Sequence, residues 1–385
     1  MFAVGFFVRP LGAIIFGHIA DRLGRRPALV LSLMLMTVAT VAFGLLPTYA
    51  TVGLLAPVLL LLCRTLQGLS ASAEVTGAQL LILEHAPAGR RGRAVAVNNA
   101  AGHLASAAAA TTGLLLARLL SPEQLAGWGW RLAFLAAAPI GLVGLYVRTR
   151  LVDSPAFLAL GERAKQGRAP LTQALRTAKR GMLIVGVWTA VTTLGVYLLV
   201  GLLPSYLVQT AGLSRTDAFT TNLIAVLTLA SSALIGGYLL DRYPLRRVAI
   251  VAMAGVAVMA VPGFLIITEG RSFSAALTGQ IMWTMFLGAT YTTGTMLAVT
   301  LFPVAVRFTA TALAFNIGIA LFGSTAPYVS TWLVSTTHSP IAPGVYLLIA
   351  ALAGLLSAYF GLPRREGASD LAAARWPSAR AASTR

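Results

Sequence analysis

Polar segments divide this chain into eleven apolar stretches of about 19 residues or more, each long enough to cross a bilayer as a helix. Only 10% of the 385 residues are charged, against about a quarter in a soluble domain. Because a lipid-exposed backbone must satisfy its own hydrogen bonds and the alternation typical of barrel strands is absent, we predict an all-α integral membrane protein. The predicted spans are 1–19, 28–46, 54–83, 94–119, 131–149, 182–208, 219–240, 248–268, 274–301, 307–334 and 344–362.

A charged motif occurs at the end of one apolar stretch in each half of the chain. The first copy consists of Gly17, Asp21, Arg22, Arg25 and Arg26, and the second of Gly237, Asp241, Arg242, Arg246 and Arg247. A charged hairpin repeated once per half is typical of a transporter built from two helix bundles. The predicted organisation is a first bundle of five spans at 1–149, a linker at 150–180, a second bundle of six spans at 181–362 and a tail at 363–385.

The distribution of basic residues predicts the orientation of the chain. Of the 29 Lys and Arg residues, 23 lie in alternate connections and the tail, and 4 lie in the opposite set of connections. The positive-inside rule therefore places the C-terminus in the cytoplasm and Met1 outside. A full span precedes the span that ends in Asp241, but none precedes the span that ends in Asp21. Repeat logic thus predicts a complete architecture of six plus six helices, with the first helix missing here.

The linker and the tail are predicted from their composition. The basic segment 150–180 contains Ser154 followed by Pro155, which is a helix-start pattern, and a second start at Pro170. We expect short amphipathic helices there, on the cytoplasmic surface. The tail is rich in Ala, Arg and Ser, and we expect it to be disordered.

The repeated motif has a physical interpretation as a gate. Gly17 allows a neighbouring helix to approach closely, as small residues do in membranes. Asp21 lies one helical turn later, at the membrane edge, where it can meet a helix N-terminus or an arginine. Such contacts can form in one state of a transporter and break in the other. The alternative is that the motif arginines only anchor the topology against lipid phosphates.

Charged residues inside the spans mark a candidate pathway for substrate and protons. Arg9 and Arg64 each lie within an apolar stretch, where a charge costs roughly 2.5–3.5 kcal/mol. Helical geometry places Arg64, Gln67 and Glu74 within one arc of about 80°. We predict that the arginines bind a carboxylate and that Glu74, their expected internal partner, exchanges the proton. For Glu74 a structural ion pair between helices is an equally good interpretation.

Weaker polar stripes extend the candidate pathway. Asn99 and His103 share one face of the span 94–119, and Tyr291 lies in a polar stripe of the span 274–301 with Trp283 beside it. Tyr197 continues a threonine stripe of the span 182–208. Lining of a cavity is one interpretation, although Ser and Thr in membrane helices often bond their own backbone. Imidazole can titrate near physiological pH, so His103 is a candidate for proton transfer. A purely structural role is an equally good interpretation.

Several function classes are excluded by what the sequence lacks. An enzyme would need clustered ligands or a nucleophile with its base, and four scattered histidines with one cysteine, Cys63 inside an apolar run, supply neither. No Gly-x-x-x-x-Gly-Lys-Ser/Thr loop for an ATP-driven pump occurs. We therefore predict no enzyme, no metal and no cofactor. The net charge of +18 follows the membrane topology, so we expect no nucleic acid partner.

Several short motifs, which together span nearly the whole chain, follow one another in the same order as in a known protein family. They are 5–12, 64–74, 84–87, 128–131, 153–157, 302–307 and 322–327, together with the Gly-x-x-x-Asp-Arg hairpin. With them the chain resembles the major facilitator superfamily, and within it the metabolite:proton symporter family. The resemblance implies a two-bundle fold, a gating role for the hairpin and proton coupling through the segment 64–74. It adds Asn316, which follows the motif at 302–307, to the candidate pathway.

The sequence therefore predicts a secondary transporter that works by alternating access. Its expected substrate is a small polar metabolite, foremost an organic acid, moved with protons and driven by the proton gradient. A zwitterionic osmolyte such as betaine or proline, an inactive remnant and a membrane sensor are the alternatives. We expect a monomer in the cytoplasmic membrane of a bacterium, in contact with substrate, protons and lipid only.

Overall fold

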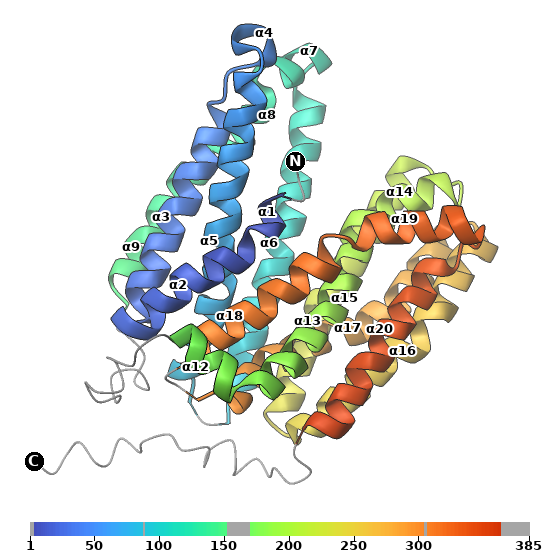
Figure 1. Cartoon of the computed structure of the whole chain (residues 1–385). Helices are drawn as coiled ribbons and strands as arrows, with labels where there is room; N and C mark the ends of the chain where they lie inside the picture. The colour runs from blue at the N-terminus through green and yellow to red at the C-terminus, as the bar shows by residue number, and fades with distance from the viewer. Residues whose placement is uncertain (1–3, 88, 152–169, 304–305, 363–385) are drawn as a thin grey trace, which may run out of the picture. The chain divides into compact units, whose positions relative to one another are not determined.

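The computed structural model describes residues 4–87, 89–151, 170–303 and 306–362. Within these ranges all regular structure is helical and no strand occurs (Figure 1). The all-α prediction is thereby confirmed. The expected helix start at Ser154 and the expected disordered tail lie outside the described residues.

The first half of the chain forms long helices separated by short ones. The helices are α1 (Val4–Phe7), α2 (Arg9–Leu23), α3 (Arg25–Gly44), α4 (Tyr49–Val52), α5 (Leu55–His85), α6 (Arg91–Leu119), α7 (Pro122–Gln124), η1 (Leu125–Gly129), α8 (Trp130–Leu135) and α9 (Ala137–Thr149). The second half begins with the amphipathic helix α12 (Pro170–Thr177), which starts at the predicted proline.

The remaining helices complete the second half. They are α13 (Lys179–Tyr197), η2 (Leu198–Leu202), α14 (Leu203–Gln209), α15 (Arg215–Leu240), α16 (Leu245–Gly270), α17 (Phe273–Leu301), α18 (Arg307–Gly318), η4 (Ile319–Gly323), α19 (Ala326–Thr337) and α20 (Ala342–Gly361).

Nine helical segments within the described ranges are long and apolar enough to cross a membrane. They correspond to nine of the eleven predicted spans, and α6 and α17, each of 29 residues, lie at the other two. One boundary is wrong: the span predicted at 131–149 begins at Pro122. The reason is a capping box, in which Ser121 Oγ accepts from Gln124 N at 3.3 Å and Gln124 Oε1 accepts from Ser121 N at 3.0 Å.

The described chain separates into two compact units. The first consists of the described residues within Met1–Leu81, Ala105–Thr177 and Pro303–Asn316, and the second of those within Ile82–Leu104, Ala178–Phe302 and Ile317–Arg385. The units do not coincide with the sequence halves, since the beginning of α6 belongs to the second unit and most of α18 to the first. The bundle boundaries predicted from the repeat stay a prediction.

Glycines set the close packing of α1 and α2 on α5 in the first unit. A Cβ at Gly12 would lie 2.2 Å from the backbone oxygen of Leu69, and a Cβ at Gly68 would lie 2.1 Å from that of Gly5. Backbones therefore approach at both places to a distance that any side chain would prevent, as at other membrane helix interfaces.

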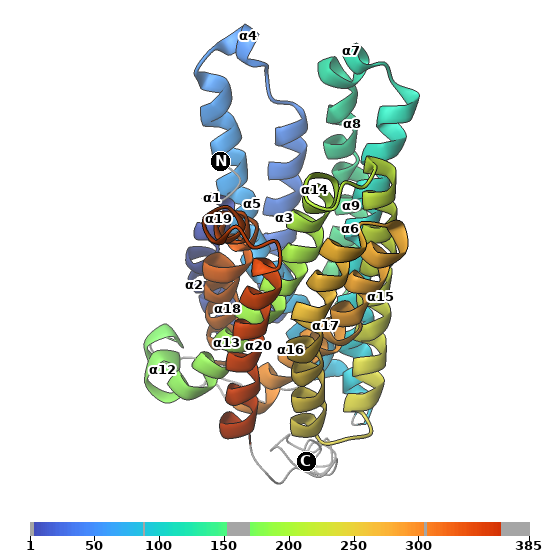
Figure 2. The same ribbon diagram turned by 90° about the vertical axis from the view of Figure 1, so that its right-hand side faces the viewer.

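In the second unit α17 is the central helix of a layer. Both α15 and α16 pack extensively along α17 but hardly touch each other, and Figure 2 shows α17 between them. The helices α13 and α20 continue the unit, because α20 packs on both α16 and α13.

Candidate functional site

The first motif copy places a carboxylate against the beginning of another helix of the first unit. Asp21, 5% exposed at the end of α2, accepts hydrogen bonds from the backbone N of Thr309 at 3.0 Å and from its Oγ1 at 2.7 Å. Thr309 is in the first turn of α18, where backbone N–H groups have no intrahelical acceptor. The other Asp21 oxygen accepts from Arg25 Nη1 at 2.6 Å. The carboxylate thus joins a helix N-terminus and a buried cation.

The glycine of this copy makes the contact possible. A Cβ at Gly17 would lie 2.8 Å from Thr309 Oγ1 and 3.1 Å from Thr309 Cα. Gly17 and Asp21 are one helical turn apart and lie on the same face of α2. The same turn of α18 therefore rests on the glycine and is capped by the aspartate.

The second copy makes the equivalent contact within the second unit. Asp241, at the end of α15, accepts from the backbone N of Gly92 at 2.7 Å and from the backbone N of Arg93 at 3.2 Å. Arg93 Nε adds an ion pair at 2.8 Å. A Cβ at Gly237 would lie 2.4 Å from Ala96 Cβ and 2.5 Å from the oxygen of Gly92. Here the capped helix is α6.

The two copies share one chemistry, which is a carboxylate at a positive helix N-terminus with a guanidinium beside it. The cation differs: it comes from the motif itself in Arg25, but from the capped helix in Arg93. The spacing of the motif indicates contact with a helix N-terminus or an arginine. It contains no signal for Thr309, Gly92 or Arg93 as the partners, because they are 148 to 288 residues away in sequence.

The other motif arginines do not contact either aspartate in the described structure. Arg22 is exposed, and exposed Arg26 donates to the oxygen of Thr149. Arg242 lies 4.3 Å from the ring centroid of Tyr238. Arg246 donates to the oxygen of Tyr359 at 3.0 Å, and Arg247 is exposed.

The structure brings Arg9, Arg64 and Gln67 together on one cavity of about 320 Å³ in the first unit. Arg64 Nη1 lies 3.5 Å from Gln67 Oε1, and Gln67 Nε2 donates to Thr40 Oγ1 at 3.0 Å. The guanidinium carbons of Arg9 and Arg64 lie 4.6 and 4.9 Å from the ring centroids of Phe6 and Phe43. No carboxylate of the described residues is within ion-pair distance of Arg64.

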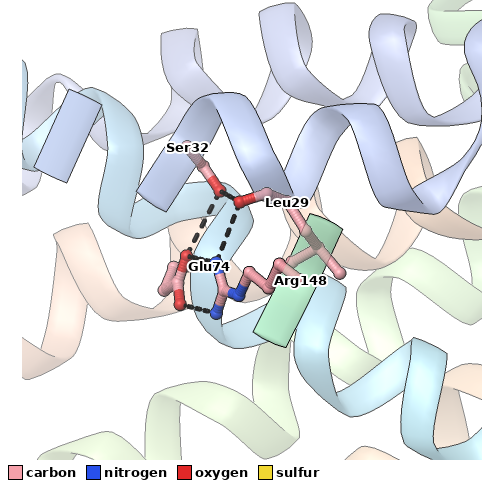
Figure 3. A network of polar contacts seen from close by, with 4 residues as sticks. All are labelled: Leu29, Ser32, Glu74 and Arg148. Atoms are coloured by element: carbon pink, nitrogen blue, oxygen red, sulfur yellow. Dashed lines mark hydrogen bonds and ion pairs between the residues drawn. The ribbon is translucent and has the colours of Figure 1, made fainter. Parts of the chain in front are cut away.

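Glu74 has a different partner from the one expected. Arg148, at the end of α9, donates from Nη1 to Glu74 Oε2 at 2.7 Å and from Nη2 to Oε1. Ser32 Oγ donates to the same carboxylate at 3.2 Å, and Arg148 Nη1 also reaches the oxygen of Leu29 at 2.8 Å. Figure 3 shows this network between α3, α5 and α9.

The predicted pairing of Glu74 with Arg9 or Arg64 is therefore wrong. Glu74 is ten residues beyond Arg64 on α5, about 15 Å along the helix axis. Arg148 lies at the end of the predicted span 131–149, and no spacing in the sequence connects it with Glu74. The tertiary structure makes Arg148 the bidentate partner of this carboxylate, which is the strong geometry for arginine and carboxylate.

The remaining candidates lie in separate surroundings. In the second unit Asn99 Nδ2 is 3.4 Å from Thr292 Oγ1, and the rings of His103 and Tyr291 meet edge to face at 5.5 Å. Trp283 is fully buried and stacks on Phe264 at 6.5 Å between centroids.

Two further candidates pack on neighbouring backbone. A Cβ at Gly323 would lie 3.0 Å from the ring of Tyr197, so this ring covers η4 within the second unit. In the first unit Asn316 Nδ2 donates to the oxygens of Ser72 at 3.2 Å and of Ala312 at 2.7 Å. Asn316 thus links α18 to the middle of α5 at Ser72, four residues beyond Gly68 on the cavity wall.

Membrane-length helices, the repeated carboxylate caps and a basic cavity together define a multi-pass membrane transport protein. Residues 1–327 match the Major Facilitator Superfamily, and the chain belongs to that family. It is accordingly a transporter rather than an enzyme.

Comparisons with individual proteins agree with this assignment. The chain is 32% identical over 361 residues to a putative proline/betaine transporter of Staphylococcus aureus (strain COL), covering 92% of this chain and 76% of the relative. It is 30% identical over 383 residues to the proline/betaine transporter of Salmonella typhimurium, covering 96% and 74%.

Solved structures show the same fold at lower identity. The proton:xylose symporter XylE superposes with a TM-score of 0.75 at 19% identity, covering 97% of this chain and 88% of that one. The human organic anion transporter MFSD10 superposes with a TM-score of 0.65 at 18% identity, covering 93% and 82%.

Proposed function

We propose that this transporter is a proton-coupled symporter of a small metabolite that carries a carboxylate. It works by alternating access, needs no cofactor beyond the proton gradient, and acts as a monomer in the bacterial cytoplasmic membrane with its C-terminus inside. The observation that carries the proposal is the convergence of Arg9, Arg64 and Gln67 on one cavity of about 320 Å³. This volume is near the lower end of the range for ligand sites, which suits a small substrate.

The carboxylate of the substrate offsets the free-energy cost of burying the arginine charge in the membrane. Each guanidinium inside a span costs roughly 2.5–3.5 kcal/mol on insertion scales. With Glu74 held by Arg148, an anionic substrate group supplies the countercharge for Arg64. The planar fork of Arg64 donates two parallel hydrogen bonds to such a group. Gln67, held by Thr40, fixes the position of the guanidinium beside it.

Two substrate classes share this carboxylate. Among the described residues, the lining of the cavity contains two arginines and no Asp or Glu, which favours an organic acid over a zwitterion. The names of the relatives, which are proline/betaine transporters, favour a zwitterion. Both classes are therefore kept, and both predict the same role for Arg64.

The two capped helix N-termini act as the cytoplasmic gate. Each aspartate contact joins helices from the two halves of the chain, α2 with α18 and α15 with α6. In our proposal these contacts form in one state of the transport cycle and break in the other. The alternative role, topology anchoring, needs neither the glycine nor the aspartate.

Glu74 is the proposed proton carrier. Protonation removes the charge that holds Arg148, so the network between α3, α5 and α9 loosens when a proton binds. The alternative is a purely structural ion pair. The side chain of Arg148 is 16% exposed and that of Glu74 is 25% exposed, and this partial burial fits both roles equally well.

The substrate site is tested by uptake into proteoliposomes under an imposed proton gradient. Radiolabelled proline, glycine betaine and succinate are compared, since they separate the two substrate classes. Arg64→Lys keeps the charge but loses the planar fork, and it should raise the KM for the transported compound at least tenfold. Arg215→Lys, an exposed arginine at the start of α15, is the matched control. Unchanged affinity in both Arg64→Lys and Arg9→Gln would show that these arginines are structural.

The proton site needs a separate measurement. Glu74→Gln should abolish accumulation driven by the proton gradient but retain exchange of labelled against unlabelled substrate. Glu269→Gln, on an exposed position of α16, serves as the control. If Glu74→Gln loses exchange and accumulation together, or neither, the proton-carrier role is rejected.

A further inference from the structure

A groove opens on the second unit because of how three helices pack. α15 and α16 both lie along α17 and hardly touch each other, so the space between them has α17 as its floor. This space, the α15–α16 groove, has a volume of about 580 Å³. Its walls include Ser232 and Ile235 on α15 and Val251 on α16, and its floor includes Met285 and Ala289 on α17.

The groove offers an almost wholly apolar surface. Ile235, Val251 and Met285 are 59, 63 and 50% exposed, respectively. The two serine hydroxyls of the groove donate to backbone oxygens: Ser231 Oγ to that of Leu227 at 2.9 Å, and Ser232 Oγ to that of Met285 at 2.6 Å. Away from the end formed by Tyr243 and Arg247, the described walls therefore offer a polar solute no free hydrogen-bonding groups, whereas a hydrocarbon chain fits them.

The length of the groove matches one leaflet of a bilayer. On α15 it extends from Thr228 to Leu239, which is about 16 Å at helical rise. Half of the hydrocarbon core is about 15 Å. The groove thus has the length of an extended acyl chain in one leaflet, and it ends at the hairpin that joins α15 and α16.

A cation closes this end. Among the three arginines of the hairpin, Arg242 stacks on Tyr238 and Arg246 bonds to the oxygen of Tyr359, and neither lines the groove. Arg247 does line it, is exposed, and has no side-chain hydrogen bond or ion pair in the described structure. Tyr243, 51% exposed, lies at the same end.

We propose that the α15–α16 groove binds one anionic phospholipid, with an acyl chain along the groove and the phosphate at Arg247. The apolar walls hold the chain, and the Arg247 guanidinium binds the phosphate oxygens. Asp241, the nearest acidic residue of the hairpin, is occupied by Arg93 and so leaves the net charge at this end positive. The site is separate from the arginine cavity of the first unit and does not depend on the transported substrate.

Native mass spectrometry of the delipidated protein with palmitoyl-oleoyl phosphatidylglycerol tests the proposal. A single retained lipid is expected, bound more tightly than palmitoyl-oleoyl phosphatidylcholine. Arg247→Gln should raise the dissociation constant about fivefold, equivalent to about 1 kcal/mol for one basic residue at a lipid surface. Ser231→Phe, at an exposed position inside the groove, should abolish retention by filling it.

Matched variants keep the test specific. Arg242→Gln removes the same charge from the same hairpin, and Leu234→Phe adds a ring to an exposed position of α15 outside the groove. Both should bind phosphatidylglycerol as the unaltered protein does, and Arg247→Lys should recover most of the affinity. If all variants retain both lipids equally, the lipid is part of a general shell around the protein and the site does not exist. Equal loss in Arg247→Gln and Arg242→Gln would likewise reject it.

Discussion

Asp21→Asn should weaken the contact between α2 and the N-terminus of α18. The carboxylate accepts from Arg25 Nη1, Thr309 N and Thr309 Oγ1 at 2.6, 3.0 and 2.7 Å. An amide has a single acceptor oxygen and turns N–H donors toward one of these groups. Arg25, with a fully buried side chain, then keeps its charge but loses the Asp21 countercharge.

The magnitude follows from this burial. Removing one member of a buried ion pair costs about 3–5 kcal/mol, because the remaining charge is left unpaired. Arg25 Nη1 retains a hydrogen bond to the oxygen of Ala20 at 3.0 Å, so the lower value applies. About 3 kcal/mol shifts the equilibrium between formed and broken contact by roughly 10²-fold.

Hydrogen exchange of the Thr309 amide measures this equilibrium directly. The amide is in the first turn of α18, so its protection comes from Asp21 rather than from the helix. In Asp21→Asn its exchange should accelerate by roughly 10²-fold. Asp241→Asn is the internal control, since it should deprotect the amide of Gly92 and leave Thr309 unchanged. Unchanged exchange at Thr309 in Asp21→Asn would refute the argument.

Three further outcomes are expected. Gly237→Ala should reduce the initial uptake rate more than Gly17→Ala does. The methyl added at Gly237 would lie 2.5 Å from the backbone oxygen of Gly92, whereas the methyl added at Gly17 would lie 2.8 Å from the side-chain hydroxyl of Thr309. Equal uptake rates in the two variants would contradict this. Arg148→Gln should lower the stability to heat in detergent by about 1–3 kcal/mol, discounted for partial exposure, and adding Glu74→Gln should restore part of it; purely additive losses would show that the two side chains are not coupled. Ala50→Cys, in a cysteine-free background, should be labelled by an impermeant maleimide only from outside the cell, and labelling only from the cytoplasm would overturn the predicted orientation.

The sequence by itself determined the helical architecture. Span length and hydropathy are local properties, so the described helices follow from them to within a few residues. The largest error, the start of the span at Pro122, came from a local capping box that a search for apolar residues does not detect. The spacing of Gly17 and Asp21 likewise indicated a close contact with a helix N-terminus or an arginine.

Only the tertiary structure decided which groups meet. Thr309, whose amide Asp21 caps, is 288 residues from Asp21, and Arg148 is 74 residues from Glu74, so no periodicity or spacing connects the members of either pair. From the sequence we expected Glu74 to be the internal partner of Arg9 and Arg64, because it is the evident acidic residue within the same predicted spans. Packing instead brings α9 to Glu74 and leaves Arg64 facing a cavity. The α15–α16 groove is also a product of the tertiary structure. It exists because α15 and α16 both pack on α17 and hardly touch each other, and the sequence of neither helix predicts this packing.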